Sequence, residues 1–147
     1  MKALIVDDES MPAEYLVFVL KRNFLEFAEI EVALGATSGK DKLENKYYDV
    51  LFLDVDMPQM TDFELLEEVI VPDSTKIIFI TAYEEYALKA FRAKAIDYLV
   101  KPIAEIELFK AMQKISTENR AEQQKESITV YSDNEYHVVK QAEIIRI

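Results

Sequence analysis

Carboxylates, a hydroxyl and an amine follow four apolar runs of this chain, where each run ends. Asp7 and Asp8 follow ALIV, Asp54 lies near the end of DVLFLDV, Thr81 follows KIIFI, and Lys101 follows AIDYLV. Close carboxylates repel one another unless a hard divalent cation with oxygen ligands, such as Mg²⁺, lies among them. A cation, a lysine and a hydroxyl together can stabilise a transferring phosphoryl group, and an unprotonated aspartate can act as the nucleophile.

Each of these features also has an ordinary structural interpretation. An aspartate pair can form a solvated loop after a strand, Thr81 can cap a helix, and the Lys101-Pro102 pair can form a surface turn. An aspartate at the end of a buried strand nevertheless costs solvation free energy. The coincidence of these residue types at four strand ends therefore favours a functional site.

The apolar runs alternate with longer segments of helical period, a pattern typical of a parallel sheet covered by helices. The five predicted strands are residues 3–6, 30–34, 49–55, 76–80 and 95–100. The carboxyl ends of parallel strands lie at one edge of the sheet, where ligands bind in α/β proteins. We therefore expect the acids, the hydroxyl and the amine to share that edge.

Apolar residues at helical spacing predict the helices between the strands. We expect Ser10 to cap the first helix, residues 39–46 to form a short second helix, and a third helix to end before Pro72. The apolar stripes of the first, third, fourth and fifth helices are Leu16, Val19, Leu20 and Phe24; Leu65, Leu66 and Val69; Ala87, Ala90 and Phe91; and Ile106, Phe109, Met112 and Ile115.

Composition limits the class of protein. The chain has 147 residues and no cysteine, which excludes a large multi-domain enzyme, a disulfide framework and a thiolate site. No apolar run reaches transmembrane length, and the N-terminus becomes acidic too early for a signal peptide, so we expect a cytoplasmic protein without membrane association. The 28 acidic residues exceed the 17 basic ones, so the chain should repel a phosphate backbone.

The composition changes after residue 116. Residues 117–127 are polar and charged, and we interpret them as a linker or an extension of the last helix. Residues 128–147 have short strand-like patterns but are too few to bury a core of their own. We predict one complete domain over residues 1–116 and the opening of a second over residues 128–147, in which His137 is interpreted as an exposed strand residue.

The ordered motifs IVDDE, LDVDMP, ITA and DYLVKP resemble the receiver domain of two-component response regulators. The resemblance implies a flavodoxin-like, doubly wound five-stranded parallel sheet in the order 2-1-3-4-5. It implies a signalling domain, not an enzyme, that accepts a phosphoryl group on Asp54 from a sensor histidine kinase. The roles implied are Mg²⁺ binding by Asp7, Asp8, Asp54 and the backbone carbonyl of Asp56, phosphoryl contacts by Thr81 and Lys101, an aromatic switch at Tyr98, and a cis peptide at Pro102.

A second resemblance concerns the effector. Residues 81–102 are similar to receivers joined to LytTR-type DNA-binding domains, and residues 126–147 look like the first strands of such a domain. DNA binding and transcription control are therefore expected only through the rest of an effector domain. The face made by the fourth helix, fifth strand and fifth helix is the candidate surface for a homodimer.

The chain departs from the receiver pattern at Thr61 and Asp62, where many receivers have an acid or Asn followed by Gly. Asp tolerates the left-handed conformation better than most residues, so this departure concerns loop geometry more than the chemistry. Asp56 and Tyr83 lie two residues after the phosphoacceptor and the threonine. We predict that they tune the lifetime of the phosphoryl group, although Tyr83 can also be read as a cover for the fourth helix.

Two other functions deserve comparison. DVDMP approximates the nucleophile motif of haloacid dehalogenase-type phosphatases, but in that family the second acidic cluster follows the lysine, whereas here Asp7 and Asp8 precede the nucleophile. An unphosphorylated pseudo-receiver that serves only for interaction is disfavoured by the intact set of acids, hydroxyl and lysine.

Overall fold

The computed structural model describes residues 1–54, 65, 69–82 and 95–116. The chain divides into two units, Met1–Ala111 and Met112–Ile147. The first unit carries the sheet and all the strands described below. In the second unit the structure describes only residues 112–116, which are helical.

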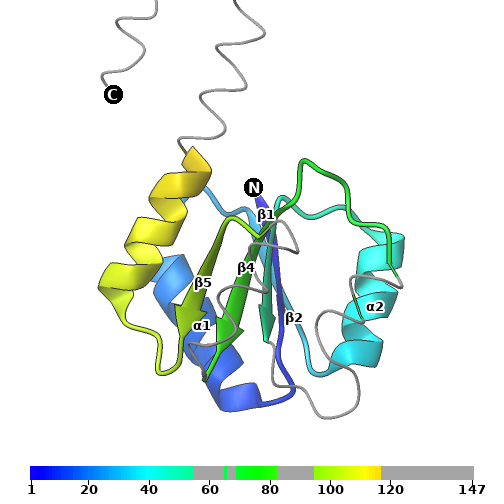
Figure 1. Cartoon of the computed structure of the whole chain (residues 1–147), viewed down its shortest axis with the longest axis horizontal. Helices are drawn as coiled ribbons and strands as arrows, with labels where there is room; N and C mark the ends of the chain where they lie inside the picture. The colour runs from blue at the N-terminus through cyan, green and yellow to red at the C-terminus, as the bar shows by residue number, and fades with distance from the viewer. Residues whose placement is uncertain (55–64, 66–68, 83–94, 117–147) are drawn as a thin grey trace, which may run out of the picture. The chain divides into compact units, whose positions relative to one another are not determined.

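Five parallel strands form one sheet in the order β2-β1-β3-β4-β5, as predicted (Figure 1). They are β1 (Lys2–Val6), β2 (Glu29–Ala33), β3 (Val50–Asp54), β4 (Lys76–Thr81) and β5 (Asp97–Val100). β1 and β3 lie inside the sheet, and their apolar residues are buried on both faces. Near-continuous apolar runs are expected for strands covered on both faces.

The strand ends differ slightly from the prediction. β2 ends at Ala33, so Leu34 is outside the strand and is exposed. β5 begins only at Asp97, and the preceding Ala95 and Ile96 are not part of the strand. In contrast, β4 extends one residue further than predicted and includes Thr81.

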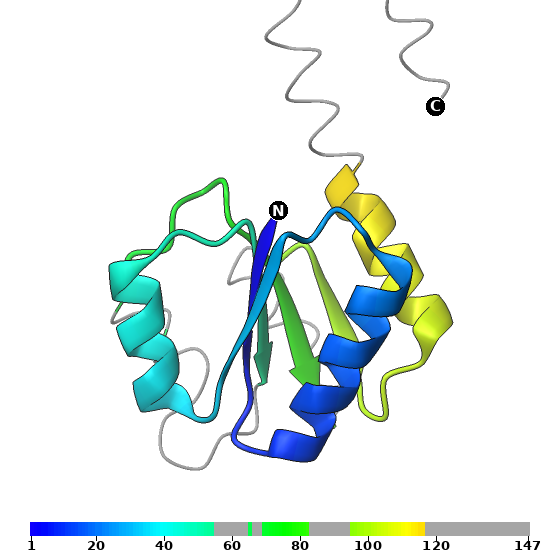
Figure 2. The same ribbon diagram turned by 180° about the vertical axis from the view of Figure 1, so that it is seen from behind.

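Helices lie on both faces of the sheet. α1 (Ser10–Asn23) and the helical residues 105–111 lie side by side on one face, and α2 (Ala36–Asn45) lies on the other (Figures 1 and 2). Arg22 of α1 forms an ion pair of 2.8 Å with Glu105. Next to it, the rings of Phe24 and Phe109 lie 5.0 Å apart between their centroids.

Three expectations about the helices need correction. Ser10 is the first residue of α1 instead of its cap, since Glu9 occupies the cap position without a capping side-chain hydrogen bond. α2 begins at Ala36, three residues before the predicted start. On residues 105–116 the predicted stripe is only half buried, because Met112 and Ile115 are buried while Ile106 is 62% exposed and Phe109 is 36% exposed.

The buried residues nearer the start of that helix are Leu108 and Ala111, so its buried face is rotated from the predicted stripe. The predicted third helix is described only at Leu65, which is helical and buried, and at Val69, which is buried beyond it. The predicted fourth helix, the linker, the opening of the second domain and His137 lie outside the described residues.

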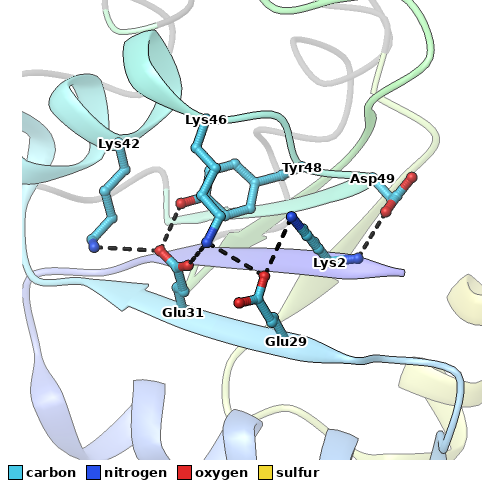
Figure 3. A network of polar contacts seen from close by, with 7 residues as sticks. All are labelled: Lys2, Glu29, Glu31, Lys42, Lys46, Tyr48 and Asp49. Carbon is cyan, nitrogen blue, oxygen red and sulfur yellow. Dashed lines mark hydrogen bonds and ion pairs between the residues drawn. The ribbon is translucent and has the colours of Figure 1, made fainter.

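A network of ionic groups holds α2 against the edge strand β2 (Figure 3). Glu31 of β2 contacts Lys46 and accepts hydrogen bonds from Tyr48 at 2.7 Å and Lys42 at 3.4 Å. Lys46 also lies 3.4 Å from Glu29. The hydrogen bonds from Lys46 and Tyr48 lower the pKa of Glu31 from 4.5 to about 2. The network therefore stabilises Glu31 as a carboxylate at the edge of the sheet.

Candidate functional site

The register of the central strands brings two aspartates to the same edge of the sheet. Val6, the last residue of β1, pairs with Leu53 of β3, and each is followed directly by an aspartate. Asp7 continues the ladder beyond β1, since its backbone N–H donates to the carbonyl of Ala33 at 3.1 Å. Asp54 is the last residue of β3. The two carboxylates thus lie at the carboxyl ends of neighbouring strands, as the sequence predicts.

Asp7, Asp8 and Asp54 form an acidic cluster. Each offers a carboxylate oxygen, and these oxygens lie within 4.8 Å of one another. Asp7 is 2% exposed and Asp54 is 1% exposed, whereas Asp8 is exposed. Buried carboxylates at this separation repel one another, and oxygen donors are the ligands that Mg²⁺ prefers. The donor set therefore fits a magnesium ion.

Lys101 is the cationic partner of the two buried acids. Its Nζ atom lies 3.2 Å from Oδ2 of Asp54 and 3.4 Å from Oδ2 of Asp7. Burial alone would lower the pKa of Lys101, but the charges of Asp54 and Asp7 outweigh it and raise the pKa above its usual value of 10.5. Lys101 is therefore a fixed positive charge beside the acidic cluster at neutral pH. The peptide bond from Lys101 to Pro102 is cis.

The loop after β1 also orients Asp7. The backbone N–H of Glu9 donates to Oδ1 of Asp7 at 2.9 Å, and Oδ2 faces Lys101. This bond to a residue two positions on is typical of an Asx turn. Glu9 is not among the predicted site residues, but an aspartate that follows a strand and has a free position two residues on, as in Asp7-Asp8-Glu9, is a signal that could have indicated the turn.

Thr81 and Tyr98 lie on the opposite face of the sheet from the buried acids. Phe79 belongs to the core cluster that includes Ala36 of α2, and Tyr98 packs against that cluster. Tyr98 is also paired in register with Phe79. Side chains two residues apart in a strand point to the same face, so Thr81, which is 1% exposed, lies on the face of Phe79 and Tyr98.

Asp7 and Lys101 instead line a cavity of about 520 Å³ on the α1 face, together with Leu16 of α1. The carboxylates and the amine of the candidate site therefore lie on one face of the sheet. The hydroxyl of Thr81 and the ring of Tyr98 lie on the other face. Of the predicted site residues, Asp56 and Tyr83 lie outside the described residues.

The fold and this strand-end chemistry define an α/β protein with an acidic cluster, a lysine and a buried threonine at one edge of a parallel sheet. Residues 3–113 match the response regulator receiver domain family. The chain belongs to that family. Receiver domains bind Mg²⁺ through acidic residues and interact with histidine kinases and effector domains, and an acidic cluster of this kind is present here.

Regulators from several bacteria are similar to this chain. The sensory transduction protein LytT of Bacillus subtilis is 37% identical over 121 residues, which cover 82% of this chain and 50% of LytT. The transcriptional regulatory protein BtsR of Escherichia coli is 35% identical over 136 residues, which cover 92% of this chain and 54% of BtsR. The chain thus spans about half the length of these curated relatives.

A solved structure agrees with the fold. A CheY-like response regulator receiver domain from Methanospirillum hungatei superposes with a TM-score of 0.71 at 28% identity, covering 82% of this chain and 97% of that one. The similarity to LytT and BtsR agrees with the predicted similarity to receivers of LytTR-type regulators. Nothing in these matches supports the phosphatase alternative. Among residues 1–54, 69–82 and 95–116, no helix has the length and apolar character needed to cross a membrane.

Proposed function

We propose that Asp54 accepts a phosphoryl group from a sensor histidine kinase and that this event controls a DNA-binding effector domain. The observation that carries the proposal is the position of Lys101, 3.2 Å from Asp54 and 3.4 Å from Asp7, beside three carboxylates whose oxygens lie within 4.8 Å of one another. This arrangement pairs the carboxylate of Asp54 with a cation at the edge of the sheet where a phosphoryl donor would approach.

The reaction transfers one phosphoryl group. An Oδ atom of Asp54 attacks phosphorus in line, the new P–O bond forms an acyl phosphate, and the bond from phosphorus to the histidine nitrogen of the donor breaks. The histidine nitrogen leaves with the bonding electron pair. Lys101 neutralises charge on the phosphoryl oxygens, and Thr81 contacts them from the other face of the sheet.

Asp7, Asp8 and Asp54, with the backbone carbonyl of Asp56, would hold Mg²⁺ in this proposal. The ion supplies positive charge that offsets the repulsion between the incoming phosphate and the carboxylates. The turn at Glu9 and the contact with Lys101 keep Asp7 in position for this role. Slow self-catalysed phosphorylation and dephosphorylation are consistent with it, but the chain acts as a signalling domain and not as an enzyme.

The proposed signalling output depends on the positions of Thr81 and Tyr98 on the face of the sheet opposite the buried acids. Movement of Thr81 toward the phosphate would open space on the face that holds Tyr98, and Tyr98 would turn inward. The change would reach the face made by the fourth helix, fifth strand and fifth helix, the proposed dimer surface. We place the receiver in residues 1–116, the linker in 117–127 and the opening of a LytTR-type domain in 128–147, with the whole protein in the cytoplasm.

The test is intact-mass analysis after incubation with acetyl phosphate. Wild type should gain the mass of one phosphoryl group when Mg²⁺ is present and not when it is chelated, and Asp54→Asn should gain none. Asp41→Asn, which changes an exposed aspartate of α2, is the matched control and should behave as wild type. Equal mass gain in wild type and Asp54→Asn would refute the assignment of Asp54.

A further inference from the structure

Gly39 of α2 lies directly against the last residue of β1. Gly39 is buried, and a Cβ atom at this position would lie 2.8 Å from Cγ1 and 3.0 Å from Cγ2 of Val6. Carbon atoms that are not bonded attract best at about 3.5–4.0 Å and repel strongly at these shorter distances. Glycine therefore allows α2 to approach β1 more closely here than any residue with a side chain would.

Val6 has little room to move away from such a clash. It is fully buried, and its β-branched side chain is restricted about χ1. β1 is hydrogen-bonded on both sides, with Val6 paired to Ala33 of β2 and to Leu53 of β3. Because protein interiors are close-packed and transmit strain, a methyl group added to Gly39 would displace the end of β1 relative to α2.

The end of β1 determines the position of Asp7. Asp7 follows Val6 directly and is tied to β2 by the 3.1 Å hydrogen bond from its N–H to Ala33. Its carboxylate is 2% exposed and lies 3.4 Å from Lys101. A displacement of Val6 would therefore also displace the next residue, Asp7, which is a member of the acidic cluster. The other buried acid, Asp54, lies on a different strand.

We propose that Gly39 is a positioning residue for the acidic cluster. Because Gly39 has no side chain, α2 packs closely on Val6, and this packing holds Asp7 in position for cation binding. The inference rests on the proposed function, because it takes the cluster to bind Mg²⁺. Gly39 belongs to a helix on the opposite face of the sheet from Asp7, so its effect passes through Val6.

The first test compares Gly39→Ala with wild type in the full chain. Isothermal titration with Mg²⁺ should show roughly tenfold weaker binding in Gly39→Ala, the size of effect that residues behind metal ligands commonly have. Thr37→Ala is the control, because it makes an alanine on an exposed position of the same helix. It should leave the affinity unchanged. In the metal-free protein, the backbone amide resonances of Asp7 and Glu9 should shift in Gly39→Ala and not in Thr37→Ala.

A rescue experiment separates positioning from a general loss of stability. Val6→Ala removes both methyl groups that the new Cβ atom would meet. Combined with Gly39→Ala, it should restore Mg²⁺ affinity to within roughly twofold of wild type, since the two substitutions are coupled by direct contact. The double variant should still unfold at a lower urea concentration than wild type, because buried methyl groups are lost. If Gly39 matters only for stability, affinity and stability will instead fall together.

Val6→Ile gives an independent test if Gly39→Ala does not fold. The added methyl group pushes on Gly39 from the strand side and should also weaken Mg²⁺ binding. The inference alone is overturned if Gly39→Ala binds Mg²⁺ as tightly as wild type, or if adding Val6→Ala does not restore the affinity, while Asp54→Asn still weakens binding. A wild-type chain that binds no Mg²⁺, or whose binding does not respond to Asp54→Asn, overturns the proposed metal site and the inference together.

Discussion

Replacing Lys101 by methionine tests the electrostatics of the site most directly. The substitution keeps a long apolar stem but removes the charge that lies 3.2 Å from Asp54 and 3.4 Å from Asp7. Two unit charges at this separation attract one another by roughly 5 kcal/mol at an effective dielectric constant of about 20. Much of this attraction offsets the cost of burying the groups. Because removing one partner of a buried pair leaves the other uncompensated, we expect Lys101→Met to lower the free energy of unfolding by about 3 kcal/mol without metal.

Magnesium should reduce this loss of stability. In Lys101→Met the buried acids lose the positive charge of Lys101, so Mg²⁺ should bind the variant more tightly than wild type. A ligand that binds only the folded state stabilises it more as its affinity rises. The added stability on saturation with Mg²⁺ should therefore be larger for Lys101→Met, even though the variant is less able to stabilise a phosphoryl group.

Urea unfolding followed by circular dichroism at pH 7 measures both effects, once with a chelator and once with Mg²⁺. Lys110→Met is the matched control, because Lys110 is an exposed lysine that lies 3.7 Å from Glu107. An exposed pair of this kind contributes little, so the control should change stability by less than about 0.5 kcal/mol. The reasoning is refuted if Lys101→Met is as stable as wild type in the chelator, or if Mg²⁺ stabilises the two proteins equally.

The remaining predictions concern the edge of the sheet and the lifetime of the phosphoryl group. Because the folded pKa of Glu31 is lowered from 4.5 to about 2, its charge stabilises the fold above pH 4.5, and this contribution is lost as the pH falls toward 2. Glu31→Gln should lower the free energy of unfolding by about 1 kcal/mol at pH 7, because solvent screens these partly exposed ion pairs. In urea unfolding at several pH values, its difference from wild type should shrink toward pH 2, whereas exposed Glu44→Gln should show almost none. Tyr83→Ala should accelerate dephosphorylation while leaving Mg²⁺ affinity nearly unchanged, if the Tyr83 ring shields the phosphoryl group from water as we predict. Identical decay of phosphorylated wild type and Tyr83→Ala would reject this shielding role.

Strand positions follow from the sequence because fully buried parallel strands need unbroken apolar runs, and polar residues must mark their ends. Asp54 and Thr81 are the last residues of β3 and β4, where hydration or a ligand can compensate a polar group. The same reasoning places Lys101 one residue beyond β5. The edge that gathers the acidic cluster could therefore be predicted without any coordinates.

Helix ends and helix faces are harder to predict because they depend on tertiary packing. Ser10 is a good capping residue by type, yet it is the first residue of α1 and Glu9 precedes it as the cap. Ile106 continues an apolar stripe in the sequence but is exposed, and the smaller Ala111 is buried instead. The spacing of apolar residues does not determine which of two adjoining stripes on a helix faces the sheet. That depends on where the neighbouring helices pack.

Contacts between residues that are far apart in the sequence are harder still to predict from the sequence. Gly39 reads as a weak point of a helix, since glycine lowers helix propensity. Only the packing of α2 on Val6 gives it a physical reason. Similarly, Glu31 and Lys46 read as ordinary surface charges, and their pairing depends on how α2 lies against β2. Predicting such pairings requires knowledge of the strand register and of the placement of the helices.

In the proposed function, the division of the candidate site between two faces of one sheet would let a small chemical change act as a switch. Asp7 and Lys101 line a cavity on the α1 face, while Thr81 is on the face of Phe79 and Tyr98. In the proposed function, a phosphoryl group on Asp54 adds acceptor oxygens at the edge where the two faces meet. Lys101 can bind these oxygens without moving far, because it already lies 3.2 Å from Asp54. Thr81 would have to approach from the other face, so its movement would change the packing around Tyr98 and carry the signal away from the acidic cluster.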